Sequence, residues 1–194
     1  MKTILLARHA THAEVGHVLS GRSEIPLSDA GRQEARALTA MLAAETIAEV
    51  HASPRRRTQE TAAAVAAPRG LPVRTAPALD EVDFGAFAGR SFASLDHDPD
   101  WFRWNAERGS FRCPGGETMA EAADRALAYL HALPDQASPA LLVSHCDVIR
   151  GLVCRALGAP LERMFSFDCA PASLTRLTLD GSELRVVSLN ERAR

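Results

Sequence analysis

The chain has 194 residues, of which 46% are hydrophobic, so it is long and apolar enough to bury the core of one domain. A formal net charge of −2 argues against nucleic acid or an anionic membrane surface as a partner. No run approaches the roughly 18 apolar residues of a membrane span, and Arg8 interrupts the apolar start MKTILLA too early for a signal peptide. The 4 cysteines form no CxxC pair and no zinc-ligand spacing, so we expect a cytoplasmic protein without a metal or other cofactor.

Strand-like and helical runs alternate along the chain. The first half predicts a buried strand at 3–7, a helix at 28–45 with Ser28 as its N-cap, a strand at 49–52, a helix opening at Ser53-Pro54 and a strand at 72–76. The second half predicts a helix from the capping box of Thr118 and Glu121 to about Leu133, a strand at 140–144, a helix from near Asp147 to Leu157 and a hairpin turning at Asp180-Gly181. This alternation predicts a single α/β domain over 1–194, a three-layer α/β/α sandwich with a mostly parallel central sheet.

The periodic pattern breaks down between residues 84 and 111, where 7 of the 10 aromatic side chains fall. Two interpretations stay open. The aromatic residues pack an irregular segment onto the sheet, or they form a hydrophobic cap at about 84–115 that selects a substrate with a ring or an apolar leaving group.

Polar residues follow two of the apolar strands directly. Arg8 and His9 end the first, and Ser144 and His145 end the one at 140–144. The carboxyl ends of strands in an open α/β sheet line the ligand crevice, so the two imidazoles can face one site if their strands are neighbours. A hydrogen-bonded structural histidine is the alternative for either residue taken alone.

The stretch SPRRRTQETA places Arg55, Arg56 and Arg57 in the first turn of a predicted helix. The helix dipole disfavours cations there, and such exceptions tend to fall at functional sites. A helix N-terminus with added arginine predicts a phosphate or carboxylate ligand. Because Lys2 is the only lysine in this arginine-rich chain, a solvated basic patch is the alternative.

Five motifs occur in order, namely RHA, SPRRRTQETA, LDEVDFGAFAG, PGGET and VSHCDVIRGL. Together they resemble the histidine phosphatase superfamily, which includes cofactor-dependent phosphoglycerate mutases, fructose-2,6-bisphosphatases and α-ribazole phosphatases. The resemblance extends from Thr3 to about Asn190. It implies the phosphoglycerate mutase-like fold and phosphoryl transfer through a phosphohistidine.

The resemblance also implies roles for the matching residues. His9 would be the nucleophile, and Arg8, Arg57 and His145 would bind the phosphoryl oxygens. Clustered cations suit this chemistry, because phosphoryl transfer depends mainly on positioning and on neutralising charge. The same guanidinium groups disfavour protonation of His9, which must be neutral to attack.

Glu81 would be the general acid that protonates the leaving oxygen and later activates water. This role needs a raised pKa, which an apolar wall from Phe84 and Phe87 could supply. An ordinary loop carboxylate at Glu81, with Asp80 or Asp83 as the acid, is the alternative.

The chain departs from the family pattern at several positions. Ala10, Thr11 and His12 replace the usual Gly-Glu-Thr, no asparagine follows, and Cys146 replaces a glycine. The long basic insertion of the mutases is missing. These departures argue against mutase activity.

The loop SGRSEIPLS is similar to the substrate loop of the family, which makes Ser20, Gly21 and Arg22 candidate substrate-binding residues. Cys146 is another candidate, through its backbone N–H, and His12 is a candidate for the entrance.

We therefore predict a metal-independent phosphomonoesterase that acts through a phosphohistidine on a small metabolite phosphate. The leading substrate is α-ribazole 5′-phosphate, because the chain length and the closing LRVVSLN strand are similar to those of α-ribazole phosphatases. The alternatives are a phosphoglycerate mutase-type phosphotransferase, a protein phosphohistidine phosphatase and a non-catalytic phosphate-binding module. The oligomeric state is not predicted.

Overall fold

The central sheet is built from short apolar runs whose middle residues are buried on both faces. A computed structural model describes residues 1–193 and contains one sheet of six strands. The strands are β1 (Lys2–Arg8), β2 (Glu49–Ala52), β3 (Val73–Thr75), β4 (Ala140–Ser144), β5 (Leu174–Asp180) and β6 (Glu183–Glu191). The predicted strands at 3–7, 49–52, 72–76 and 140–144 are thus confirmed, as is the hairpin that turns after Asp180.

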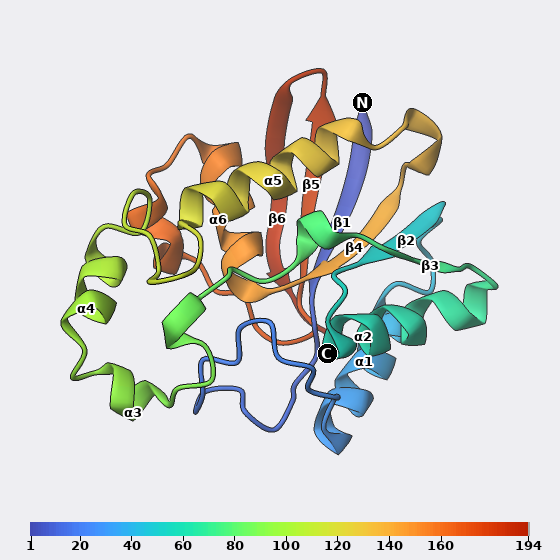
Figure 1. Cartoon of the computed structure of the whole chain (residues 1–194). Coiled ribbons are helices and arrows are strands. Elements are labelled where there is room, and N and C mark those ends of the chain that lie inside the picture. Colours follow the sequence, from blue (N-terminus) through green and yellow to red (C-terminus); the bar gives the residue numbers. More distant parts are fainter. Residues whose placement is uncertain (194) are drawn as a thin grey trace.

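The strand order is β3-β2-β4-β1-β5-β6. β3, β2, β4 and β1 run parallel, whereas β5 is antiparallel to β1 and β6 is antiparallel to β5. β1 and β4 therefore lie side by side in the middle of the sheet although they are far apart in the sequence (Figure 1). Their carboxyl ends meet at the same edge, where an open α/β sheet binds its ligands.

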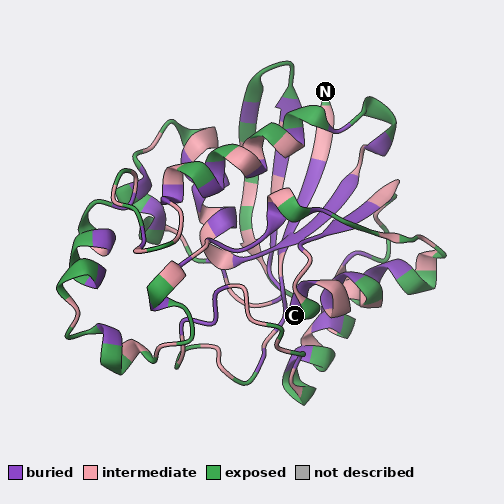
Figure 2. Ribbon diagram, in the orientation of Figure 1, coloured by how far each residue is buried: buried purple, intermediate pink, exposed green. Residues whose placement is uncertain are grey.

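Helices cover both faces of the sheet, so the predicted three-layer arrangement is confirmed. α1 (Asp29–Met41) and α2 (Arg56–Ala66) pack on one face against Leu5, Val50 and Val143. α5 (Met119–Ala132) and α6 (Cys146–Leu157) pack on the other face against Ile4, Leu6 and Leu142. Figure 2 shows the buried residues gathered along the strands between these helices. The alternation of neighbours such as Ile4 and Leu5 between two cores follows from the two-residue period of a strand.

Side-chain caps set the starts of two helices as predicted. The Ser28 hydroxyl accepts a hydrogen bond from Gly31 N at the start of α1, and Thr118 and Glu121 form a reciprocal capping box at the start of α5. The predicted extent of α1, 28–45, is wrong at its end, because the helix stops at Met41. Leu42 and Ile47 are buried in the core, and burying both requires the chain to turn between them before it enters β2.

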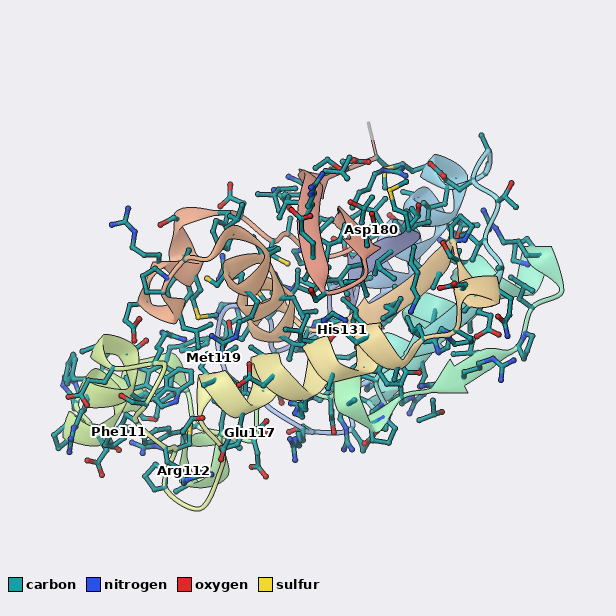
Figure 3. The ribbon with its side chains drawn as sticks, turned by 90° about the horizontal axis from the view of Figure 1, so that it is seen from above. Phe111, Arg112, Glu117, Met119, His131 and Asp180 are labelled. Carbon is teal, nitrogen blue, oxygen red and sulfur yellow. The ribbon has the colours of Figure 1, made fainter. Side chains whose placement is uncertain are left out.

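Residues 84–115 lie beyond the sheet edge and hold the short helices α3 (Phe92–Leu95) and α4 (Pro99–Ala106) (Figure 1). This aromatic-rich segment packs in a third hydrophobic cluster, which it shares with α5 and α6 and in which Trp101 and Trp104 stack with ring centroids 5.3 Å apart. It continues into α5 through the stretch that Figure 3 marks with Phe111, Arg112, Glu117 and Met119. The segment is thus packed onto the end of α5 rather than onto the middle of the sheet.

Short 3-10 helices complete the described structure. They are η1 (Ala67–Arg69), η2 (Pro77–Leu79), η3 (Gly85–Phe87), η4 (Asp135–Ala137) and η5 (Leu161–Ser166). Among residues 1–193, no helix combines the length and the apolar character that crossing a membrane requires.

Gly31 provides a test of how tightly α1 packs against the loop that follows β1. A Cβ atom at this position would lie 1.9 Å from the carbonyl oxygen of Thr11. Replacing a helical glycine by alanine ordinarily stabilises a helix by about 1 kcal/mol. We expect Gly31→Ala to lower the free energy of unfolding instead, by about 1–3 kcal/mol, because backbone must shift to relieve the contact.

Urea denaturation followed by circular dichroism would measure this effect. Gln33→Ala, at an exposed position in the same turn, serves as the control and should leave the stability nearly unchanged. A Gly31→Ala variant as stable as the wild type would show that α1 and the loop do not pack as closely as described.

Candidate active site

The site forms where β1 and β4 end. Arg8 and Ser144, the last residues of the two strands, are register partners, and His9 N donates a 3.0 Å hydrogen bond to Ser144 O. The next residues, His9 and His145, have ring centroids 5.3 Å apart. The two imidazoles therefore lie together at the strand ends, as expected for neighbouring strands, and the parallel pairing of β1 with β4 is the cause.

His9 has a defined tautomer. Its Nδ1 lies 2.9 Å from the carbonyl oxygen of Ala10, which only accepts hydrogen bonds, so Nδ1 carries the proton and Nε2 keeps its lone pair. Burial lowers the pKa of His9 well below its ordinary value, and the guanidinium groups of Arg57 and Arg8 lower it further. The imidazole is therefore neutral near pH 7 and carries a free lone pair on Nε2.

Arg57 is the buried cation of the site, with only 1% of its surface exposed. Its Nη2 donates to Gly21 O at 2.6 Å, and its Nη1 donates to Ser23 O at 2.9 Å. Backbone carbonyls of the loop thus hold the side chain, while Nε has no hydrogen-bond partner within residues 1–193. Carbonyls fix the guanidinium without cancelling its charge, which stays available to an anion.

Arg57 also determines the tautomer of His145. Its Nη2 lies 3.0 Å from His145 Nδ1, and because a guanidinium only donates, Nδ1 is the acceptor. The proton of His145 is then on Nε2, which donates to Ser53 Oγ at 2.7 Å. The Ser53 hydroxyl in turn donates to Asp80 Oδ1 at 3.1 Å. Burial, followed by the charge of Arg57, lowers the pKa of His145 well below its usual value.

The prediction that Ser53-Pro54 opens a helix is wrong. α2 begins at Arg56, and Arg55 stands at the N-cap without a side-chain cap. The buried Ser53 hydroxyl accepts a hydrogen bond from His145 and donates one to Asp80. It also accepts from the backbone N–H of Arg55 at 3.3 Å, but Arg55 lies before the first residue of the helix. The serine links His145, which follows β4, to Asp80, which follows η2, instead of starting the helix.

Glu81 follows η2 and enters the same cavity as His9. One of its carboxyl oxygens accepts from Val82 N at 3.0 Å, and the other lies 3.8 Å from His145 Nδ1. Burial raises the pKa of Glu81 to about 8, and the charge of Asp147 also raises it, whereas Arg57 opposes the rise. The carboxyl group is therefore largely protonated at neutral pH and can donate a proton.

The two alternative acids are engaged elsewhere. Asp80 binds Ser53 and lies 3.1 Å from Arg55 Nε, and Asp83 accepts from Arg22 Nη1 at 3.2 Å. Neither lines the cavity, whereas Glu81 does. The geometry therefore favours Glu81 over its neighbours.

Arg8 supplies a second cation beside His9. Its Nη1 donates to the carbonyl oxygen of Cys169 at 2.6 Å, and its buried Nε has no partner within the described residues. Arg8 and Arg57 are thus both held by carbonyls and both keep unsatisfied donors. Arg55 and Arg56 differ, because they pair with Glu24 and Glu60 at 2.6 and 2.7 Å, as expected for charges on the rim.

Arg8, His9, Arg57 and Glu81 line one cavity of about 300 Å3 between the strand ends and the aromatic-rich segment. His145, although predicted to bind the phosphoryl group, is fully buried and does not line this cavity.

From the loop after β1 and from the start of α6 the cavity receives Ser20, Gly21 and Cys146, three of the candidates. Arg22, the fourth, does not line it. Its guanidinium points toward Asp83 and Glu117 and donates to the carbonyl oxygen of Glu81, so it braces the acid-bearing loop from behind.

The aromatic side chains of this segment both pack together and line the cavity. Phe84, Phe92, Trp101 and Trp104 line the cavity, and all four also pack in the third hydrophobic cluster. Packing and enclosure of the site are therefore achieved by the same residues.

His12 also reaches the cavity, with its ring centroid 5.2 Å from that of His9. Its Nδ1 accepts from Glu14 N at 3.4 Å, and burial together with Arg57 and Arg8 lowers its pKa to about 4. His12 is thus a neutral imidazole whose Nε2 carries the proton. Within residues 1–193, no group of three or more His, Cys, Asp or Glu side chains is arranged to hold a metal ion.

Sequence reasoning missed several residues of the cavity wall, among them Arg108, Asp147, Arg150 and Phe165. Asp147 and Arg150 lie within the motif VSHCDVIRGL, just after the end of β4, which was the signal that could have pointed to them. Arg108 and Phe165 belong to none of the five motifs, and arginine is the default cation of this chain, so no local signal distinguished these two.

Comparison with known proteins agrees with this geometry. The family model of the histidine phosphatase superfamily (branch 1) matches residues 4–192. Phosphoserine phosphatase 1 of Hydrogenobacter thermophilus is 27% identical, and the alignment covers 98% of this chain and 92% of the relative. "Probable phosphoglycerate mutase GpmB" of Salmonella choleraesuis is 33% identical, with 94% and 87% covered. The crystal structure of the α-ribazole phosphatase from Shigella flexneri is similar with a TM-score of 0.86 and 26% identity, covering 98% of this chain and 97% of that one.

The raised pKa of Glu81 predicts a pH-dependent loss of stability. Between the ordinary glutamate pKa near 4.5 and the folded value of about 8, the unfolded chain releases this proton while the folded chain keeps it. The contribution of this proton to the free energy of unfolding is therefore fully present below about pH 4.5. It is lost as the pH rises to 8, by at most about 1.4 kcal/mol per pH unit. We expect Glu81→Gln to unfold at higher urea concentration than the wild type at pH 8.5, with the gap closing toward pH 5.

The measurement is a series of urea titrations from pH 5 to 8.5. Asp135→Asn, which removes an exposed carboxylate far from the cavity, is the control and should not alter the pH profile. A Glu81→Gln profile parallel to that of the wild type would mean that Glu81 is not protonated in the folded protein.

Proposed function

This chain belongs to the histidine phosphatase superfamily, and we propose that it is a phosphomonoesterase in which His9 is the nucleophile. The observation that carries the proposal is the state of His9, a neutral imidazole with its Nε2 lone pair free, in one cavity with the carbonyl-held cations Arg8 and Arg57. A nucleophile beside unsatisfied guanidinium donors suits an in-line attack on a phosphate ester.

In the proposed reaction His9 Nε2 attacks phosphorus while the bond from phosphorus to the ester oxygen breaks. Glu81 transfers its proton to the leaving alcohol and becomes a carboxylate. The carboxylate then takes a proton from water, whose oxygen attacks the phosphohistidine and releases inorganic phosphate. His9 and Glu81 return to their starting states, and no metal takes part.

Arg8 and Arg57 are assigned to the phosphoryl oxygens, whose charge they neutralise. His145 assists by accepting from Arg57 and so orienting its guanidinium. Direct contact between His145 Nδ1 and a phosphoryl oxygen requires a proton on that nitrogen. An imidazolium formed beside a phosphate dianion would donate from both nitrogens, but it would give up the hydrogen bond from Arg57 to Nδ1.

We propose a small phosphate ester as substrate, since a cavity of about 300 Å3 enclosed by the aromatic-rich segment suits a small molecule better than a protein surface. α-Ribazole 5′-phosphate is the candidate with a neutral, ring-bearing leaving group. The aromatic lining and the likeness to an α-ribazole phosphatase support it. We also propose that the chain is one phosphatase domain and that residues 84–115 form its cap.

A mutase is the second candidate, because several relatives are named "Probable phosphoglycerate mutase GpmB". The neutral side chains at positions 10–12 and the missing basic insertion argue against mutase activity. A mutase requires a bisphosphate primer and releases little free phosphate.

The test is phosphate release from an aryl phosphate in EDTA between pH 5 and 8, with the wild type and His9→Ala compared. We expect wild-type turnover and a loss of at least about 10³-fold in His9→Ala, because the nucleophile is gone. His131→Ala is the matched control, since this histidine is exposed near the far end of α5 (Figure 3), and its activity should equal that of the wild type.

Turnover retained by His9→Ala would overturn the mechanism. No turnover by the wild type, together with primed interconversion of phosphoglycerates, would identify a mutase instead.

Inorganic phosphate provides a separate probe of the anion site. Arg57→Ala should weaken competitive inhibition by phosphate roughly tenfold or more, because a buried charged donor is lost. Arg56→Ala, next in sequence but exposed and paired with Glu60, should leave the inhibition constant unchanged. If the two variants behave in the opposite way, the anion site lies on the rim of α2.

A further inference from the structure

The cavity wall beside the nucleophile presents a hydrogen-bond donor that the proposed reaction does not use. His12 lines the cavity, and its ring centroid lies 5.2 Å from that of His9. Its Nε2, which carries the proton, makes no hydrogen bond within residues 1–193 and is not among the buried polar atoms that lack a partner. The Nε2–H group therefore has accessible surface at the cavity and is free to donate to a ligand.

The backbone that carries His12 is held from several sides. The preceding residue, Thr11, donates its N–H to Glu34 Oε2 on α1 at 2.8 Å. His12 itself forms an antiparallel β-bridge with Leu27, and its Nδ1 accepts from Glu14 N. The imidazole is thus preorganised beside the nucleophile, so that little conformational freedom is lost when it binds a ligand.

The position of His12 determines which oxygen of a phosphate ester it meets. In an in-line attack the leaving oxygen lies on the side of phosphorus opposite His9, and the three equatorial oxygens lie around the axis of attack. A donor on a ring that lies next to the nucleophilic ring faces the equatorial oxygens. It does not face the leaving oxygen, to which Glu81 is assigned.

His145, which the family resemblance assigns to the phosphoryl group, is engaged elsewhere. Its Nδ1 accepts from Arg57 Nη2 at 3.0 Å, and its Nε2 donates to Ser53 Oγ at 2.7 Å. Its side chain is fully buried and does not line the cavity. A third donor beside Arg8 and Arg57 therefore has to come from another part of the cavity wall, and His12 lies next to the nucleophile.

The two guanidinium groups also explain why this donor is neutral. Burial, followed by the charges of Arg57 and Arg8, lowers the pKa of His12 to about 4, so the imidazole is uncharged near pH 7. A neutral N–H adds a hydrogen bond to an anion without adding a third positive charge, which the two arginines would repel.

We propose that His12 is a further substrate-binding residue, which donates its Nε2–H to an equatorial phosphoryl oxygen beside those that Arg8 and Arg57 bind. The inference rests on the proposed function and adds a ligand to its phosphoryl site. It also gives a role to a position at which the chain departs from the family pattern, since His12 stands where the family usually has threonine.

The first experiment measures binding of inorganic phosphate by isothermal titration calorimetry, because phosphate probes this site without a leaving group. We expect His12→Phe, which keeps a ring but has no N–H, to raise the Kd of phosphate roughly tenfold or more, as for the loss of a hydrogen bond to a charged acceptor. His12→Gln, whose amide N–H reaches about as far as Nε2, should restore most of the affinity. His17→Phe, which replaces an exposed histidine of the same loop, is the matched control and should bind phosphate like the wild type.

A phosphate titration of the wild type followed by proton–nitrogen NMR of the imidazole groups gives an independent reading if His12→Phe does not fold. The Nε2–H signal of His12, assigned by its loss in His12→Gln, should move downfield as phosphate binds. The change in its chemical shift should yield the same Kd as calorimetry.

The outcomes separate this inference from the proposed function. An unchanged phosphate Kd in His12→Phe, or an Nε2–H signal that phosphate does not move, would overturn the inference and leave the phosphatase standing. A loss of kcat/KM for phenyl phosphate with an unchanged phosphate Kd would assign His12 to the leaving group and overturn the inference as well. Phosphate binding without hydrolysis of any ester would refute the proposed function, and the phosphate Kd of His12→Phe would still decide whether His12 belongs to the anion site.

Discussion

The parallel pairing of β1 with β4 is the contact on which the rest of the site depends. It places Arg8 opposite Ser144 and brings His9 and His145, which are far apart in the sequence, to a centroid distance of 5.3 Å. A shift of the register by one residue would turn each strand's side chains to the other face. The buried Ile4, Leu5 and Leu6 oppose such a shift, because they pack alternately into the two cores. The hydrophobic core thereby sets the spacing of the polar site.

The second organising feature is how buried charge is compensated. In the site, backbone carbonyls hold Arg8 and Arg57, so their positive charge remains for a ligand. Beside it, carboxylates pair with Arg55 and Arg56, through Glu24 and Glu60. Burial works in the opposite sense on the acid, since it keeps Glu81 protonated and stops it from cancelling the cations. A cavity with this balance attracts anions and still contains a proton donor.

Local signals predicted the parts of the fold that local interactions determine. Apolar runs identified β1 and β4, and the capping box at Thr118 identified the start of α5, because a few neighbouring residues suffice for each. The end of α1 and the start of α2 were predicted wrongly. In both places a tertiary contact decides the boundary, through the buried Leu42 in one case and through Ser53, which binds His145 and Asp80, in the other.

The sequence by itself determined the α/β class, the strand ends that carry Arg8 and His9, and the motif order that resembles the histidine phosphatases. These follow from periodicity and spacing within short stretches. Only the tertiary structure decided the tautomers of the two histidines, the turn of Arg22 away from the cavity and the free Nε2–H group of His12. Each of these depends on partners far away along the chain, and whether a polar atom finds a partner is settled only when the whole chain has packed.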